Sequence, residues 1–142
     1  MFQNPSKDEI AALLKRAKTI AVVGLSPNPA RPSNSVSRAM QGFGYRIIPV
    51  HPALDEVLGE KVAKSLDDVQ ALLEPGEQID IVDVFRSPEH VAGIVDDCIR
   101  LGFKAIWLQE GVIDATAAAK AREAGIFIVM DRCIYKDRAS MR

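Results

Sequence analysis

The sequence predicts an α/β fold: a single Rossmann-like, doubly wound domain whose five-stranded, mainly parallel sheet carries helices on both faces. Short apolar runs rich in valine and isoleucine alternate with segments in which apolar residues recur at helical spacing. This alternation is typical of parallel strands joined by crossover helices. The runs are apolar on both sides, as in strands that are buried on both faces of a sheet. Because 142 residues suffice for one hydrophobic core, we expect one domain over residues 1–142.

Helix caps and glycines place the elements of the first half of the chain. Ser6 and Glu9 form the S-x-x-E pattern of a capping box, after which apolar residues recur at helical spacing. Asn34 or Ser35 can cap the next helix, and Ser65 can cap a short third one. The expected order is a helix reaching residue 17, a strand over 19–23, a helix ending at residue 43, a strand over 45–50, a mostly loop segment over 53–64 and a short helix over 66–73.

The second half of the chain continues the alternation. Pro88 opens a helix, because proline is tolerated at the first helical position. The buried stripe of that helix includes Val91 and Cys98. Asp114 caps the last helix, which Gly125 ends. The expected order is a strand over 79–85, a helix from 88 to 101, a strand over 105–108, a helix to residue 124 and a strand over 126–130.

Composition and charge exclude several classes of protein. With 48% hydrophobic and 26% charged residues, the chain is typical of a globular protein, and it has neither a membrane-spanning apolar run nor a secretory signal pattern. A formal net charge of −1 does not favour binding to nucleic acid. Two cysteines make no disulfide framework, and no Cys/His spacing indicates a metal site. We therefore expect a cytoplasmic protein that holds no metal and contacts no membrane.

The segments that follow the five strands contain most of the polar, small and cationic residues near the sheet. The strands themselves are nearly all apolar. Since ligands of such sheets bind beyond the carboxyl ends of the strands, we expect the functional site at this edge. The five segments are Gly24-Leu25-Ser26, Val50-His51-Pro52, Phe85-Arg86-Ser87-Pro88, Gln109-Glu110-Gly111-Val112 and Asp131-Arg132-Cys133.

The loop after the first strand is the strongest single indication of a nucleotide site. The strand stops at Gly24, and three prolines, Arg31 and Ser33 follow as the next helix begins. Glycine lets the backbone turn tightly and approach a phosphate, and a helix start presents unpaired N–H groups to an anion. Only one glycine of the G-x-G-x-x-G pattern is kept here. We therefore expect a nucleotide with phosphate that need not be a dinucleotide.

The end of the second strand argues against a nicotinamide cofactor. Sites for NAD place Asp or Glu there to bind the ribose hydroxyls. Here the strand ends in Val50-His51-Pro52, and the first acids, Asp55 and Glu56, come later. This end better suits a nucleotide with an additional ribose phosphate, although a nicotinamide-dependent oxidoreductase or another nucleotide-binding enzyme stays as the alternative. A phosphoreceiver would need acidic residues after the first strand, where none are found.

Taken together, the strand-end segments resemble a known family. The motifs are the glycine loop with its distal Arg31 and Ser33, Val-His-Pro at 50–52, Asp-Val-Phe-Arg at 83–86, Trp-Leu-Gln-Glu-Gly-Val at 107–112 and Met-Asp-Arg-Cys at 130–133. In this order they resemble the small stand-alone CoA-binding proteins, a family similar to the CoA-binding domain that begins the succinyl-CoA synthetase alpha subunit. The resemblance extends from the first helix to Tyr135. The chain ends soon after the fifth strand and lacks the synthetase's later domain with its phosphorylated histidine, which argues against ligase activity.

The resemblance implies a binding site for coenzyme A or an acyl-CoA, without catalytic residues. We expect a carrier, sensor or regulator of an acyl-CoA pathway that has a protein partner or forms a homo-oligomer. The resemblance also implies which residues contact each part of CoA. The phosphates and adenosine would be surrounded by Gly24, Leu25, Ser26, Arg31, Ser33 and Val36. The adenine or ribose would be flanked on one side by Val50, His51 and Pro52 and on the other by Phe85, Arg86 and Val91. The pantetheine would pass along Trp107, Gln109, Glu110 and Gly111.

Several of these residues also have a purely structural interpretation. Arg86 can form a structural ion pair, His51 can serve the turn, and Trp107 can pack in the core. Cys133 follows the last strand at the same edge, near Arg132 and Lys136 in the sequence. Because cations favour a thiolate, this cysteine could form a mixed disulfide with the pantetheine thiol. The alternative, more usual for a free cysteine, is a buried and inert side chain.

Overall fold

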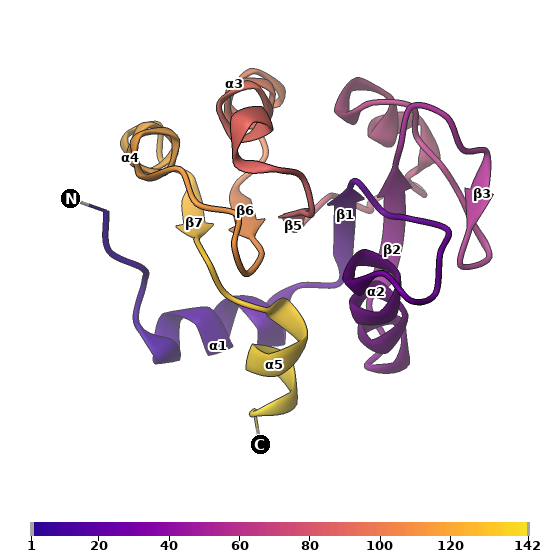
Figure 1. The fold of residues 1–142 in the computed structure, drawn as a ribbon, viewed down its shortest axis with the longest axis horizontal. Helices are drawn as coiled ribbons and strands as arrows, with labels where there is room; N and C mark the ends of the chain where they lie inside the picture. The colour runs from indigo at the N-terminus through magenta and orange to yellow at the C-terminus, as the bar shows by residue number, and fades with distance from the viewer. Residues whose placement is uncertain (1, 142) are drawn as a thin grey trace.

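The computed structural model describes residues 2–141 and contains a five-stranded sheet in which every neighbouring pair of strands is parallel (Figure 1). The strand order is β2-β1-β5-β6-β7, so the order reverses between β1 and β5. The predicted α/β fold class is therefore confirmed. The strands are β1 (Thr19–Val23), β2 (Arg46–Val50), β5 (Ile81–Val84), β6 (Ala105–Leu108) and β7 (Phe127–Val129).

Helices cover both faces of this sheet, as Figure 1 shows. On one face, α1 (Lys7–Arg16), α2 (Pro32–Gly42) and α5 (Ile134–Ala139) pack against side chains such as Ile20 and Trp107. On the other face, α3 (Val91–Leu101), α4 (Ala115–Glu123) and the 3₁₀ helix η1 (Leu66–Leu72) contribute to a second apolar cluster. Because successive strand residues point to opposite faces, each strand contributes to both clusters. Among residues 2–141, no helix has the length and apolar character needed to cross a membrane.

The structure confirms some predicted helix starts and corrects others. Ser6 forms the expected capping box with Glu9, and the side chain of Asp114 caps α4. The predicted start of α2 at Asn34 or Ser35 is wrong, because the helix already begins at Pro32, in a position that tolerates proline. The Asn34 side chain is used elsewhere, since it donates to the carbonyl of Ser26. Ser65 stands at the predicted N-cap position of η1, but its side chain caps no helix N–H; its hydroxyl donates to Asp68.

Three of the described elements were not predicted. The segment expected as mostly loop contains a hairpin of β3 (Glu56–Val57) and β4 (Glu60–Lys61), with Leu58 at φ 54° and Gly59 at φ 75°. Positive φ at both central residues is typical of a two-residue hairpin turn, but leucine seldom adopts it and so gave no signal. The other unpredicted element is α5, whose six residues are too few for a recognisable helical period.

Candidate functional site

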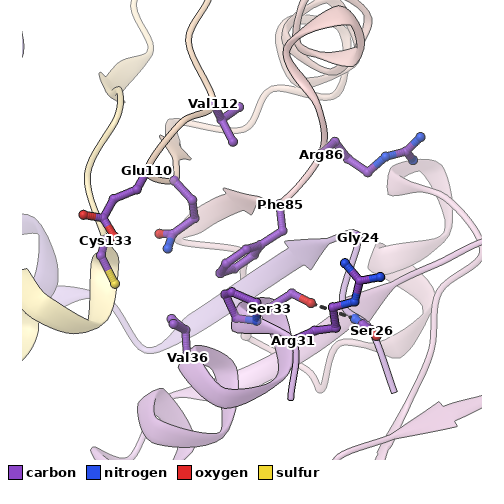
Figure 2. Close-up of a pocket in the computed structure, with 12 residues that line it drawn as sticks. Gly24, Ser26, Arg31, Ser33, Val36, Phe85, Arg86, Glu110, Val112 and Cys133 are labelled. Atoms are coloured by element: carbon purple, nitrogen blue, oxygen red, sulfur yellow. Dashed lines mark hydrogen bonds between the residues drawn. The ribbon is translucent and has the colours of Figure 1, made fainter. Parts of the chain in front are cut away.

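A cavity of about 490 Å³ opens at the carboxyl ends of β1, β5, β6 and β7 (Figure 2). It lies beside the point where the strand order reverses, which is the usual place for a ligand in an open α/β sheet. Its volume falls within the range of small-molecule pockets. We call it the strand-end pocket. Its lining residues are Gly24, Ser26, Arg31, Pro32, Ser33, Val36, Phe85, Arg86, Gln109, Glu110, Val112 and Cys133.

Gly24 lets β1 turn directly against the end of β5. Its φ is +87°, and a Cβ atom at this position would lie 2.6 Å from the carbonyl oxygen of Phe85 and 2.9 Å from Cδ of Arg86. Its N–H donates to the carbonyl of Val50 at 3.0 Å. The glycine is therefore required by the neighbouring strand ends. This confirms the tight turn predicted from the sequence, and the close approach of a phosphate stays a prediction.

The loop between Gly24 and α2 is fixed by its own hydrogen bonds. The N–H of Ser26 donates to Oγ of Ser33 at 2.9 Å, and Nδ2 of Asn34 donates to the carbonyl of Ser26 at 2.9 Å. An Asx turn, in which the N–H of Ala30 donates to Oδ1 of Asn28, precedes the helix. Because Ser26 is bound to the first turn of α2 and Arg31 directly precedes that helix, the position of Arg31 is set by the helix start.

Two arginines give one end of the pocket its positive charge. In Figure 2 the side chains of Arg31 and Arg86 lie on the same side of the pocket as Gly24 and Ser26, and Glu110 and Cys133 lie on the opposite side. Within residues 2–141, neither arginine forms an ion pair with a carboxylate. Arg86 instead contacts Nε2 of His90 at 3.0 Å. Both guanidinium groups are therefore available to an anion.

The opposite end of the pocket is formed where β6 leads into its loop and β7 leads into α5. Gln109 is only 4% exposed, and its Oε1 accepts the N–H of Ile134 at 3.0 Å. Glu110 forms an ion pair with Lys136 at 3.2 Å. Val112 and Cys133 complete this end with an apolar surface and a thiol. This end is therefore nearly neutral, in contrast to the arginine end.

A buried carboxyl, that of Asp83, lies on β5 close to the pocket. Asp83 pairs with Val22 and Trp107 on the neighbouring strands and so shares the face covered by α2 and α5. It stands two residues before Phe85, which lines the pocket. Asp83 is 1% exposed, and its Oδ1 has no hydrogen-bond partner among the described residues. Burial raises the pKa of this carboxyl well above its usual range, which favours the neutral acid.

Not all residues in the predicted set reach the pocket. The structure brings together Gly24, Ser26, Arg31, Ser33, Val36, Phe85, Arg86, Gln109 and Glu110. Outside the lining are Leu25, Val50, His51, Pro52, Val91, Trp107 and Gly111.

The reasons differ between these residues. Trp107 is wholly buried in the core on the face covered by α1, α2 and α5, and its Nε1 donates to the carbonyl of Arg132 at 2.8 Å. The side chains of Val50 and Val91 belong to the core on the opposite face. His51 serves a turn, since its Nδ1 accepts the N–H of Ala53 at 3.1 Å.

Three lining residues were absent from the predicted set: Pro32, Val112 and Cys133. Val112 and Cys133 belong to strand-end segments that the sequence had singled out, so their position along the chain was the available signal. Pro32 lies between Arg31 and Ser33, which both belong to the predicted set, so its place in the chain was again the available signal.

Comparison with known proteins gives the family of the chain. A family model described as "CoA binding domain" matches residues 18–139. The protein YneT of Bacillus subtilis is 44% identical over 133 residues, which cover 94% of each chain. The solved structure of cell-free ID.343 from Thermus thermophilus has a TM-score of 0.85 and 36% identity, and the match covers 95% of this chain and 98% of that one.

A more distant relative is the ADP-forming acetate–CoA ligase of Methanocaldococcus jannaschii. It is 25% identical over 87 residues, which are 61% of this chain but only 12% of the ligase. The match is therefore confined to a small part of that enzyme. The family model, in contrast, spans the whole sheet and every segment that lines the pocket. The chain belongs to the CoA binding domain family.

Proposed function

We propose that this protein binds coenzyme A, free or as an acyl thioester, in the strand-end pocket, as a non-catalytic carrier, sensor or regulator. The observation that carries the proposal is the division of the pocket into a cationic end and a nearly neutral end. Coenzyme A has the same division, with its phosphates on the nucleotide and an uncharged pantetheine arm that ends in a thiol. Membership of the CoA binding domain family supports the same ligand.

The nucleotide phosphates are assigned to the arginine end. Arg31 and Arg86 line the pocket without a carboxylate partner among the described residues, and a guanidinium group matches phosphate oxygens in geometry and charge. The positive end of the α2 dipole lies beside them, because Arg31 is the residue that precedes the helix. These features favour an anion with several phosphate oxygens at this end.

The pantetheine arm is assigned to the opposite end. Phe85 and Val36 lie between the two ends in Figure 2 and offer apolar contact along the path. Gln109 and Val112 then provide one amide and one apolar side chain. An arm of methylene groups interrupted by amides suits this mixture of surfaces.

Chemistry on the bound ligand has little support in the lining. Among the described residues, the one carboxylate that lines the pocket is Glu110, which is paired with Lys136. The relative with a named ligase activity matches only over a small part of its length. A nicotinamide cofactor has no support at the end of β2, where the first acid, Asp55, is paired with Lys64 at 2.9 Å. We therefore retain binding without catalysis.

Native mass spectrometry of freshly purified protein tests the proposal directly, because a co-purifying CoA or acyl-CoA would appear as a defined mass increase. Calorimetric titration in reducing buffer then ranks CoA, acetyl-CoA, 3′-dephospho-CoA and NAD. We expect CoA to bind more tightly than NAD. Loss of the 3′-phosphate should weaken binding by about ten- to a hundred-fold, the equivalent of one charge-assisted contact of about 1.5–3 kcal/mol. NAD binding equal to or tighter than CoA binding would refute the proposal.

A further inference from the structure

Gln109 presents an unused hydrogen-bond donor at the neutral end of the strand-end pocket. The side chain is 4% exposed, and only its Oε1 has a partner among residues 2–141, the N–H of Ile134. The amide nitrogen Nε2 has no hydrogen-bond partner among these residues, and it is not one of the buried polar atoms that lack both a partner and contact with solvent. Since a buried amide group normally has its donors satisfied, a ligand acceptor in the pocket is expected at this position.

The same hydrogen bond determines where Cys133 lies. Ile134 directly follows Cys133, so the bond from its N–H to Gln109 fixes the cysteine backbone beside the end of β6. Cys133 lines the pocket and is 8% exposed. Figure 2 shows its side chain on the side of Glu110, opposite the two arginines. A ligand with phosphates at the arginines would therefore extend its other end toward this thiol.

The second cysteine provides a matched comparison within the chain. Cys98 is fully buried in α3 on the other face of the sheet. Burial, with a further contribution from the charge of Asp97, raises the pKa of the Cys98 thiol to about 12. The thiolate is the reactive form, so Cys98 should be inert near neutral pH.

The cations near Cys133 in sequence are already engaged. Arg132 makes two hydrogen bonds to Asp137, at 2.7 and 2.6 Å, and Lys136 pairs with Glu110. Their nearness in the sequence gave no sign of these partners, which the structure supplies. Any selectivity of Cys133 must then come from how the pocket positions a bound disulfide, since proximity alone can accelerate a reaction by a large factor.

We infer that the strand-end pocket places the sulfur of a bound CoA disulfide against Cys133 and forms a reversible mixed disulfide with it. The inference rests on the proposed CoA binding and adds the position of the thiol end. Nε2 of Gln109 donates to an amide carbonyl of the pantetheine arm. The Cys133 thiol loses its proton, and its sulfur attacks one sulfur of the disulfide. The old S–S bond breaks, the Cys133–CoA disulfide forms, and the departing thiolate takes up a proton.

The test is the rate of adduct formation in the intact protein, followed by mass spectrometry. The reduced protein is mixed with CoA disulfide, oxidised glutathione or cystamine at equal concentration. We expect an adduct at least tenfold faster with CoA disulfide, located on Cys133 by peptide mapping and removed by dithiothreitol. Desulfo-CoA, which lacks the thiol, should slow the reaction by competition. Cys133→Ser should give no adduct, and Cys98 should stay unmodified.

Gln109→Glu tests the positioning role of the amide. It keeps an oxygen for the N–H of Ile134 but replaces the donor by a second acceptor. We expect the preference for CoA disulfide over oxidised glutathione, taken as the ratio of the two rates, to fall at least fivefold, since the new carboxylate repels both anionic disulfides. An unchanged ratio would refute the positioning role of the amide.

The outcomes separate this inference from the proposed function. Suppose that reduced CoA binds in calorimetry. The inference is then refuted, and CoA binding stands, if CoA disulfide forms no adduct, if the adduct is on Cys98, or if it forms no faster than with oxidised glutathione. If reduced CoA does not bind the parent protein, the proposed function fails, and the inference fails with it.

Discussion

Replacing Arg31 with alanine should weaken CoA binding and leave the fold intact. The guanidinium lines the strand-end pocket and, among the described residues, has no carboxylate partner to lose. Its side chain also contributes no cap to α2, so the helix start should not change. The affected quantity is therefore the free energy of binding, through one charge-assisted contact with a phosphate.

The size of the effect follows from the exposure of the site. A hydrogen bond to a charged group contributes about 1.5–3 kcal/mol. Arg31 is exposed, so solvent screens the contact and the lower end of that range is the better estimate. We therefore expect Kd for CoA to rise about tenfold.

Calorimetric titration and thermal melting of the same samples measure the two quantities. Arg38→Ala is the matched control, because Arg38 is exposed on the same helix and does not line the pocket. Kd should change little in the control, and both apo proteins should melt close to the parent. The loss in Arg31→Ala should shrink at high salt, as expected for an ionic contact. An unchanged Kd in Arg31→Ala, or an equal loss in Arg38→Ala, would refute the assignment of the phosphate end.

Three further predictions concern the scaffold of the site. Gly24→Ala should lower the free energy of unfolding by about 2–5 kcal/mol in denaturant titration, because the new Cβ meets the Phe85 carbonyl at a residue with positive φ. The control is Gly42→Ala, where the added Cβ has no atom within 4 Å and stability should not fall. Equal stabilities of the two variants would contradict the reasoning. The contribution of Asp83 to stability should fall as the pH rises above about 4, since its pKa is higher in the folded protein and ionisation opposes folding, with a limiting slope of about 1.4 kcal/mol per pH unit. Asp83→Asn should flatten this dependence, and an unchanged pH profile would exclude Asp83 as its source. Asp114→Ala should destabilise by about 1 kcal/mol through loss of the cap on α4, whereas no change in denaturation midpoint would show that the cap is dispensable.

The sequence predicted the architecture because its signals are local. The buried strands are nearly continuous apolar runs, and the caps at Ser6 and Asp114 act within one helical turn. The edge of the sheet that holds the pocket was predictable for a related reason. Parallel strands end on the same side, so polar residues that follow each strand must meet there.

The membership of the pocket could not be read from the same signals. Trp107 and Gln109 lie two residues apart, so their side chains point to the same face, yet the first is packed in the core and the second reaches the cavity. The Gln109 side chain is bound to the start of α5, which is six residues long and has no period that a sequence pattern could display. The contact that holds Gln109 therefore involves a helix that the sequence did not reveal.

By itself, the sequence determined a parallel α/β sheet, a glycine turn after β1 and a concentration of polar residues at one edge. The tertiary structure decided that Gly24 is required by Phe85, that Arg31 and Arg86 have no carboxylate partner among the described residues, and that Cys133 lies in the pocket. The physical reason is the range of the interactions. Helix and strand patterns arise from neighbours along the chain, whereas a backbone contact across two strands, a missing ion pair and a cysteine at a cavity depend on residues far apart in sequence.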